Sequence, residues 1–230
     1  MLVVTNATPS DWSPADNPHA IAISEAQHRG APDIPIARVI HHGLDAADFP
    51  FGDGGGDESG DFLLFLGRMA PDKGAHRAIQ VARGAGMRLL MAAKMREAWE
   101  RSYFDEQVAP LLGADAVYLG EVPHERKIEL LCQAKALLFP IRWNEPFGMV
   151  MLESMACGSP VLAFPEGAAP EVVEDGKTGF LCADEAAMVE AVGRIDELSR
   201  VDCRSAVEGY FSTERMVADH IELYRSIVRR

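Results

Sequence analysis

The sequence predicts an α/β fold in which helices cover both faces of a doubly wound parallel sheet. Short apolar segments of strand length alternate with longer stretches whose apolar residues recur at helical spacing. Strands that are apolar along their whole length are typical of a parallel sheet, because crossover helices bury both of its faces. The predicted strands are residues 62–66, 87–93, 116–119, 136–140 and 161–164.

The first of these strands leads into a turn that carries two basic side chains, Arg68 and Lys73. A helix is expected from Ala75 to Arg83, where apolar residues recur at positions i, i+3, i+4 and i+7. A guanidinium fork and an ammonium charge both suit phosphate oxygens, and ligands of open α/β sheets bind at the carboxyl ends of the strands. Taken alone, the two side chains could equally be solvated loop charges.

A second motif, residues 145–161, holds two carboxylates eight positions apart. Pro146 favours the first turn of a helix, because its missing N–H would have no partner there. Glu145 is therefore predicted in a loop and Glu153 in the helix that follows. The helix is expected to end at Gly158, before the next predicted strand.

The start of this helix is predicted to attract an anion. The first N–H groups of a helix have no acceptor within it, and the helix dipole is positive at that end, so a phosphate would be stabilised there. A glycine lets such a group approach the backbone closely. The amides concerned belong to Phe147, Gly148, Met149 and Val150.

Glu153 lies about two turns into the helix, among apolar neighbours such as Met151 and Leu152. An unpaired carboxylate is disfavoured in such surroundings. It therefore needs hydrogen-bond donors, and sugar hydroxyls would serve. The alternative is an ordinary amphipathic helix with a surface glutamate.

Both motifs resemble those of one family. The segment EPFGMVMLESMACGSPV (145–161) resembles the Glu-x7-Glu signature of retaining glycosyltransferases of family four, which have the GT-B fold and use a sugar nucleotide as donor. The segment GRMAPDKG (67–74) resembles the G-R-x-x-x-x-K-G element of the same family. The chain is thus similar to the C-terminal, Rossmann-like half of such an enzyme, which binds the donor.

The resemblance implies a role for each residue of the two motifs. Arg68 and Lys73 would hold the diphosphate of the donor, Glu153 the ribose hydroxyls and Glu145 the hydroxyls of the transferred sugar. Because these cations can neutralise the leaving diphosphate, no metal ion and no cofactor is expected. The implied catalytic residues are Glu145, Arg68 and Lys73, and the implied donor-binding residues are Gly67, Arg68, Lys73, Glu145, Phe147, Gly148, Met149, Val150 and Glu153.

Two further segments extend the resemblance and a third departs from it. Residues 117–122 are similar to the strand and loop near the base, and residues 171–181 to a loop and hairpin-like turn. After the second predicted strand the family often has a Gly-rich loop, whereas here a helix is expected from Lys94 that holds Trp99 and Tyr103. The base and the sugar of the donor are therefore not specified.

The first segment that resembles the nucleotide-binding domain of the family contains two neighbouring histidines. Residues 40–45 resemble the start of the nucleotide-binding domain, with His41-His42 where Pro-Asn is commoner. Two histidines could also be half of a metal site, but no Cys, His or Asp lies at a ligand spacing, so a turn is the better interpretation.

The composition and the motifs that are absent argue against several classes of function. The net charge of −13 argues against nucleic acid as a partner, and the absence of Gly-x-Gly-x-x-Gly disfavours a dinucleotide oxidoreductase. The four cysteines form no C-x-x-C pair and are expected to be buried thiols in a reducing compartment. No apolar stretch approaches the roughly 20 residues of a membrane span, so a cytoplasmic protein is expected. The acidic, glycine-rich residues 52–60 are expected to form a disordered surface loop.

The resemblance divides the chain into three parts. Residues 1–36 contain five prolines and correspond to a remnant of the acceptor domain and the crossover, residues 37–212 to the nucleotide-sugar donor-binding domain, and residues 213–230 to a C-terminal crossing helix. The apolar stripe of this last helix is expected to pack on residues 1–36 and on its own domain, rather than on a second chain. Either the sequence is a truncated part of a longer enzyme, or the acceptor domain comes from another protein or from a homo-oligomer.

Three functions fit these observations. The first is a retaining, hexosyl-type glycosyltransferase, or its donor-binding half, that moves a sugar from a nucleoside diphosphate to an unknown acceptor. The second is a non-catalytic nucleotide-sugar-binding module that acts with a partner chain. A GT-B-like epimerase fits least well, because its chemistry also requires a complete cleft.

Overall fold

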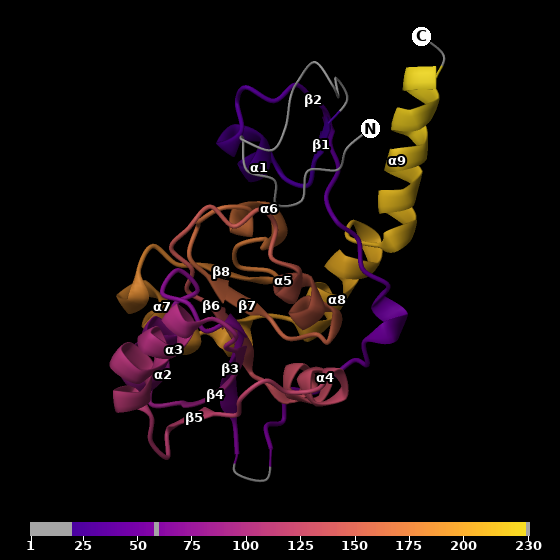
Figure 1. The fold of residues 1–230 in the computed structure, drawn as a ribbon. Coiled ribbons are helices and arrows are strands. Elements are labelled where there is room, and N and C mark those ends of the chain that lie inside the picture. Colours follow the sequence, from indigo (N-terminus) through magenta and orange to yellow (C-terminus); the bar gives the residue numbers. More distant parts are fainter. Residues whose placement is uncertain (1–19, 58–59, 229–230) are drawn as a thin grey trace.

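A computed structural model describes residues 20–57 and 60–228 (Figure 1). Its main sheet has six parallel strands in the order β5-β4-β3-β6-β7-β8. The strand order reverses between β3 and β6, so the sheet is doubly wound, as predicted. The strands are β3 (Phe62–Arg68), β4 (Arg88–Lys94), β5 (Ala116–Tyr118), β6 (Ala136–Phe139), β7 (Val161–Ala163) and β8 (Gly179–Leu181).

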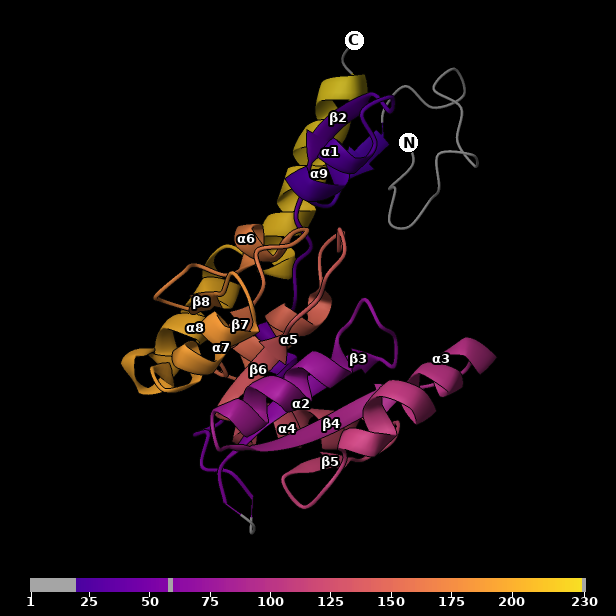
Figure 2. The same ribbon diagram turned by 90° about the vertical axis from the view of Figure 1, so that its left-hand side faces the viewer.

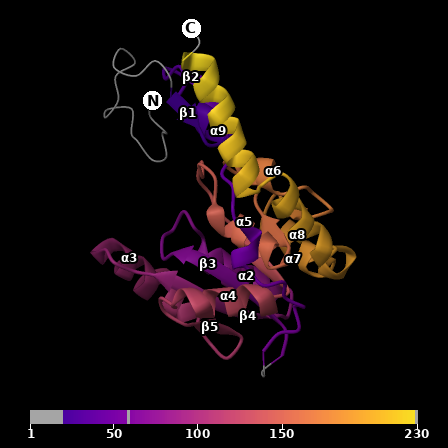
Figure 3. The ribbon, with the colours of Figure 1, turned by 90° about the vertical axis from the view of Figure 1, so that its right-hand side faces the viewer.

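Helices cover both faces of the sheet, and successive strand residues point into different layers. Leu63 and Phe65 of β3 join the cluster that contains α2 and α7, whereas Leu64 and Leu66 join the cluster that contains α4, α5 and α8. Figure 2 looks onto the first layer and Figure 3 onto the opposite side. The helices are α2 (Ala75–Gly84), α3 (Ala98–Tyr103), α4 (His124–Gln133), α5 (Met149–Ala156), α6 (Ala169–Val172), α7 (Glu185–Val192) and α8 (Arg200–Gly209). Short helical turns lie at Ala46–Asp48, Phe104–Val108, Ala109–Leu111 and Ile195–Glu197.

A small unit at one end of the molecule combines the two ends of the described chain (Figure 1). Strands β1 (Ala20–Ala22) and β2 (Ile36–Val39) pair in parallel on either side of α1 (Glu25–Gly30). The long helix α9 (Thr213–Val228) lies beside them, with Leu223 packed against Ile21 and Ile40. The packing expected for the last helix is therefore found for the described part of residues 1–36. The division of the chain at residue 36 stays a prediction.

Beyond shifts of one or two residues at element ends, three features differ from the sequence prediction. Helix α5 begins at Met149, although Pro146 was expected in its first turn. Residues 179–181 form a sixth strand, parallel to β7, where only a hairpin-like turn was expected. Lys94 does not begin a helix, because β4 continues through Lys94 in register with Arg68. Helix α3 begins at Ala98 and does hold Trp99 and Tyr103.

The expectation of a disordered acidic loop was wrong for residues 52–57. The N–H groups of Gly52, Gly54 and Gly56 donate to carbonyl oxygens of Cys157, Cys132 and Gln133 at 3.0, 3.1 and 3.0 Å. These carbonyls lie at the ends of α4 and α5, where a helix leaves its last C=O groups without partners. The loop is thus a cap for two helices, which the composition alone does not reveal.

Three of the four cysteines are buried, as expected, whereas Cys132 is partly exposed. All four thiols are free, and Cys157, Cys182 and Cys203 are buried. Within residues 20–57 and 60–228, no helix has the length and apolar character required to cross a membrane.

Candidate functional site

The two sequence motifs meet at the reversal point of the sheet. The turn after β3 and the turn after β6 lie at the carboxyl ends of neighbouring strands and open on one pocket of about 420 Å³. All of the predicted donor-binding residues except Phe147 line this pocket. They are Gly67, Arg68, Lys73, Glu145, Gly148, Met149, Val150 and Glu153.

Phe147 has a different place from the rest of its motif. Its side chain is buried and packs against the imidazoles of His42 and His41, with ring centres 5.1 and 5.8 Å apart. His41 also contacts Glu171 and Tyr210, at 3.0 and 2.9 Å. Burial lowers the pKa of His42, with the neighbouring imidazoles adding to the effect. The histidine pair is thus part of the packing behind the pocket.

Arg77 holds the two motifs together. Its guanidinium donates from Nε to the carbonyl of Pro140 at 2.8 Å, and from Nη2 to those of Pro71 and Asp72, both at 3.1 Å. The N–H of Arg142 also donates to the carbonyl of Asp72, at 2.9 Å. These bonds tie the end of β6 to the turn after β3. The sequence offered no local signal for this role of Arg77.

Helix α5 presents its first amides to the pocket. Gly148 precedes the helix in the left-handed region, with φ of +86° and no side-chain cap. A Cβ at this position would lie 3.0 Å from Phe139 and 2.8 Å from Met151. Among the described residues, no hydrogen bond involves the N–H groups of Met149 and Val150, as is usual in the first turn of a helix. Both residues line the pocket, whereas the predicted amides of Phe147 and Gly148 precede the helix, which begins at Met149.

Each predicted carboxylate of the pocket is paired with a lysine. Lys73 donates to Oε2 of Glu145, and Lys127 donates to Oε1 of Glu153 at 2.8 Å. Lys127 comes from α4 and had not been predicted, because 26 residues separate it from Glu153 and only the strand order brings them together. The hydrogen-bond donor that the sequence analysis expected for Glu153 is therefore the ammonium group of Lys127 in this structure.

Arg68 is held from the side by α3. Its Nε and Nη2 both donate to Oε1 of Glu100, at 2.8 and 2.7 Å, and its guanidinium lies 5.3 Å from the ring centre of Trp99. The backbone N–H groups of Glu97 and Arg96 donate to the same carboxylate and, together with Arg68, lower the pKa of Glu100 from 4.5 to about 2. Glu100 is buried and ionised, and the sequence analysis had missed it.

The pocket is cationic within an acidic protein. Arg68, Lys73, Lys94 and Lys127 outnumber the two glutamates that line it. An adjoining pocket of about 130 Å³ shares Lys94 and Lys127 and reaches the ends of β4 and β5. In the part of the chain that the structure describes, no cluster of three or more His, Cys, Asp or Glu side chains could hold a metal ion.

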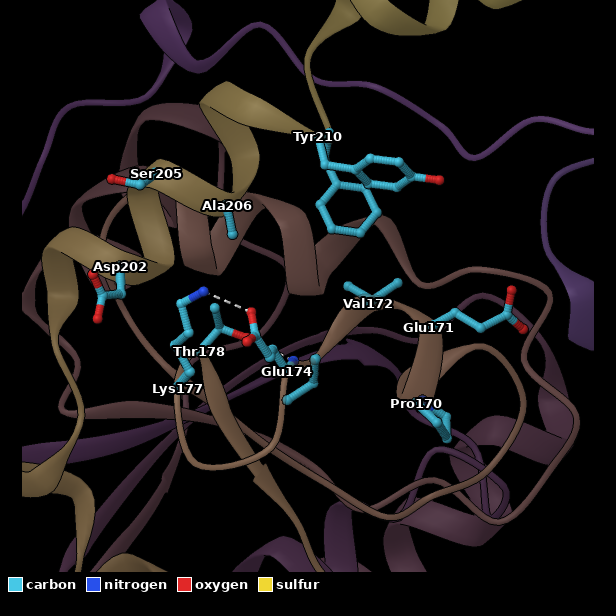
Figure 4. A pocket seen from close by; sticks show the side chains of 12 residues that line it. Pro170, Glu171, Val172, Glu174, Lys177, Thr178, Asp202, Ser205, Ala206 and Tyr210 are labelled. Atoms are coloured by element: carbon cyan, nitrogen blue, oxygen red, sulfur yellow. Dashed lines mark hydrogen bonds and ion pairs between the residues drawn. The ribbon is translucent and has the colours of Figure 1, made fainter.

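A larger pocket, of about 590 Å³, lies elsewhere, between α8 and the segment from Pro170 to Thr178 (Figure 4). None of the predicted donor-binding residues lines it. Its lysine, Lys177, is paired with Glu174 at 2.9 Å. Its carboxylate Glu171 accepts the backbone N–H groups of Glu25 and Ala26 at 2.7 and 2.8 Å. Size alone therefore does not identify the functional site.

The comparisons with known proteins all indicate the same family. The chain matches the family model "Glycosyl transferases group 1" over residues 51–204. A glycogen synthase of Mycobacterium tuberculosis (strain ATCC 25618 / H37Rv) is 31% identical over 169 residues, which are 70% of this chain and 40% of that protein. A D-inositol 3-phosphate glycosyltransferase of Acidothermus cellulolyticus is 34% identical over 179 residues, 69% of this chain and 40% of that protein. The chain thus spans about two fifths of the length of these relatives.

Solved structures show the same fold. AviGT4, a glycosyltransferase involved in avilamycin A biosynthesis, superposes with a TM-score of 0.77 at 28% identity, over 91% of this chain and 63% of that one. The Anabaena protein Alr3699/HepE, solved in complex with UDP and glucose, superposes with a TM-score of 0.77 at 20% identity, over 95% of this chain and 69% of that one. The family match and the shared α/β architecture lead to one conclusion: the chain belongs to the glycosyl transferases group 1 family, with the fold of the GT-B glycosyltransferases.

Proposed function

We propose that this chain is the donor-binding part of a retaining, hexosyl-type glycosyltransferase, which transfers a sugar from a nucleoside diphosphate to an acceptor. One observation carries the proposal. The vacant amides at the start of α5 and the ammonium group of Lys73 belong to a single cationic pocket that also contains two carboxylates. This is the combination of charges that a diphosphate linked to two hydroxyl-rich sugars requires.

The diphosphate is assigned to the positive side of the pocket. The N–H groups of Met149 and Val150 and the ammonium of Lys73 would bind its oxygens. Arg68 uses Nε and Nη2 for Glu100, which leaves Nη1 for a phosphate. The leaving diphosphate gains negative charge during transfer, and donors fixed in advance stabilise that charge most in the transition state. We therefore assign neither a metal ion nor a cofactor to the reaction.

The two sugars of the donor are assigned to the two carboxylates. Glu153 would accept hydrogen bonds from the ribose hydroxyls and Glu145 from those of the transferred sugar. The base would extend into the adjoining pocket of about 130 Å³, beside Glu121 and Val122. In this assignment the lysine partners of both glutamates remain in the pocket and turn toward the phosphates.

The acceptor site is assigned to residues outside the donor pocket. The chain spans only about 40% of its curated relatives, and placing the acceptor hydroxyl against the anomeric carbon can supply about 7–11 kcal/mol of the barrier. A further part of the protein, a partner protein or a second copy of the chain would provide that placement. The four free thiols and the nature of the donor fit a cytoplasmic location.

A non-catalytic nucleotide-sugar-binding module that acts with a partner chain is the second candidate. It would use the same pocket. Transfer activity distinguishes the two functions.

Calorimetry and a transfer assay test the proposal in sequence. The 230-residue chain is titrated with UDP, GDP, ADP and their glucose or mannose derivatives in the presence of EDTA. At least one pair of ligands should bind with 1:1 stoichiometry, and no binding of any of them would refute the proposal. Transfer is then measured with and without an added acceptor domain from a relative. Transfer that needs the added domain supports the enzyme, whereas binding without any transfer favours the module.

A further inference from the structure

Glu145 is held by two different donors at the same oxygen. The indole Nε1–H of Trp143 donates to Oε2 at 2.8 Å, and the ammonium of Lys73 pairs with the same atom. The other oxygen, Oε1, has no partner among the described residues, and Glu145 lines the donor pocket. Trp143 itself does not line this pocket, and 42% of its surface is exposed.

The backbone of Glu145 is fixed independently of its side chain. Its N–H donates to the carbonyl of Trp143 at 2.8 Å, and its carbonyl accepts the N–H of Ala168 at 2.9 Å. Only the side-chain torsions of Glu145 are left to be restrained. The two donors at Oε2 are therefore what directs the carboxylate.

These two donors respond differently to a bound diphosphate. Lys73 is charged, so an incoming diphosphate attracts it away from Glu145. The indole is neutral and keeps its hydrogen bond, because the phosphates exert no comparable attraction on it. Once Lys73 has turned, Trp143 is the remaining restraint on the carboxylate.

We propose that Trp143 is a positioning residue for the donor sugar: it holds Oε2 of Glu145, so that Oε1 is presented to a sugar hydroxyl when Lys73 binds the diphosphate. The inference rests on the proposed function, since it assumes that Glu145 accepts a hydroxyl of the transferred sugar. It assigns to Trp143 an effect on the sugar and none on the nucleoside diphosphate.

A second exposed tryptophan provides a matched control. Trp99 is 49% exposed and lies 5.3 Å from the guanidinium of Arg68, much as Trp143 lies 5.0 Å from the ammonium of Lys73. Both indoles thus contact a basic residue of the pocket. Only that of Trp143 donates a hydrogen bond to a described residue. Replacement by phenylalanine keeps the aromatic face in both cases and removes the N–H.

The test is a double-mutant cycle measured by calorimetry on the full chain. The ligands are UDP and UDP-glucose, or the best-binding pair of the donor panel. Trp143→Phe should weaken the sugar nucleotide by about tenfold, the effect of a lost hydrogen bond to a charged group, and leave the nucleoside diphosphate within about twofold. Trp99→Phe should change both affinities by the same factor. In a Glu145→Ala background, Trp143→Phe should have little further effect, because the acceptor of the indole N–H is absent.

Each other outcome has a definite meaning. Equal losses for both ligands in Trp143→Phe would overturn the inference, since the residue would then act through Lys73 or through the fold. A loss that persists undiminished in the Glu145→Ala background would also overturn it, because Trp143 would then contact the sugar directly. If the parent chain binds no ligand of the panel, the proposed function itself fails and the inference fails with it.

Discussion

Helices α2 and α5 begin in the same way but differ in what occupies their first turn. Each follows a left-handed glycine at the carboxyl end of one of two neighbouring strands, Gly74 with φ of +79° and Gly148 with φ of +86°. At α2 the N–H of His76 donates to the hydroxyl of Tyr103, at 3.4 Å, and the guanidinium of Arg77 fills the space beside Gly74. At α5 the amides open on the donor pocket.

The difference distinguishes a structural joint from the proposed ligand site. The first motif contributes side chains to the pocket, Arg68 and Lys73, while its helix start joins α2 to α3 and β6. The second motif contributes both side chains and backbone. Two similar glycine turns can therefore have unlike functions, and the decisive feature is whether another part of the chain covers the first amides.

The largest effect expected on binding comes from Lys73→Ala. Lys73 belongs to the first motif and pairs with Glu145 of the second, and a charged hydrogen bond contributes roughly 1.5–3 kcal/mol. The affinity for the nucleoside diphosphate should fall by about one to two powers of ten, as measured by calorimetry. An unchanged affinity would remove the first motif from the site.

Substitution of each glutamate should show which of the two sugars of the donor it binds. Glu153→Gln should weaken the nucleoside diphosphate and the sugar nucleotide alike, by about tenfold. Glu145→Gln should weaken only the sugar nucleotide. Identical behaviour of the two variants toward both ligands would show that the assigned division of roles is wrong.

The contrast between the helix starts can be tested with one substitution at each. Gly148→Ala forces an L-residue into the left-handed region, which costs about 1–2 kcal/mol, and should lower both the free energy of unfolding and the affinity for the nucleoside diphosphate. Tyr103→Phe removes the acceptor of the α2 amide and should lower only the free energy of unfolding, by about 1 kcal/mol. Urea denaturation and calorimetry measure the two quantities. A loss of affinity in Tyr103→Phe comparable to that in Gly148→Ala would contradict the comparison.

A further expected effect is a pH dependence of stability that originates at Glu100. Because folding lowers the pKa of Glu100 from 4.5 to about 2, its carboxylate stabilises the fold fully above pH 4.5, and this contribution is lost as the pH falls toward 2. The parent should therefore be more stable than Glu100→Gln near neutral pH, and the difference should shrink below pH 4.5. Urea denaturation between pH 6 and 3 measures it, and a constant difference would refute this role of Glu100.

The sequence predicted those parts of the fold that depend on local pattern. Apolar runs located five strands of the main sheet, because that signal acts within a few residues. Pro146 placed the start of α5 too early, since the helix begins at Met149. β8 was missed, because residues 179–181 are too short a run to stand out from the turn before them.

The parts of the site that the sequence did not predict are contacts across the chain. Lys73 meets Glu145 over 72 positions and Arg68 meets Glu100 over 32. Such pairs depend on the strand order and on helix packing, which the local pattern does not specify. The loop at 52–57 shows the opposite error, since its composition suggested disorder while its amides cap two helices.

The most direct test of the account is a crystal structure of the chain with the tightest-binding nucleoside diphosphate of the panel. The account predicts phosphate oxygens within hydrogen-bonding distance of the N–H groups of Met149 and Val150 and of the ammonium of Lys73, with the ribose hydroxyls on Glu153. A diphosphate bound at the start of α2, or in the larger pocket between α8 and residues 170–178, would contradict it.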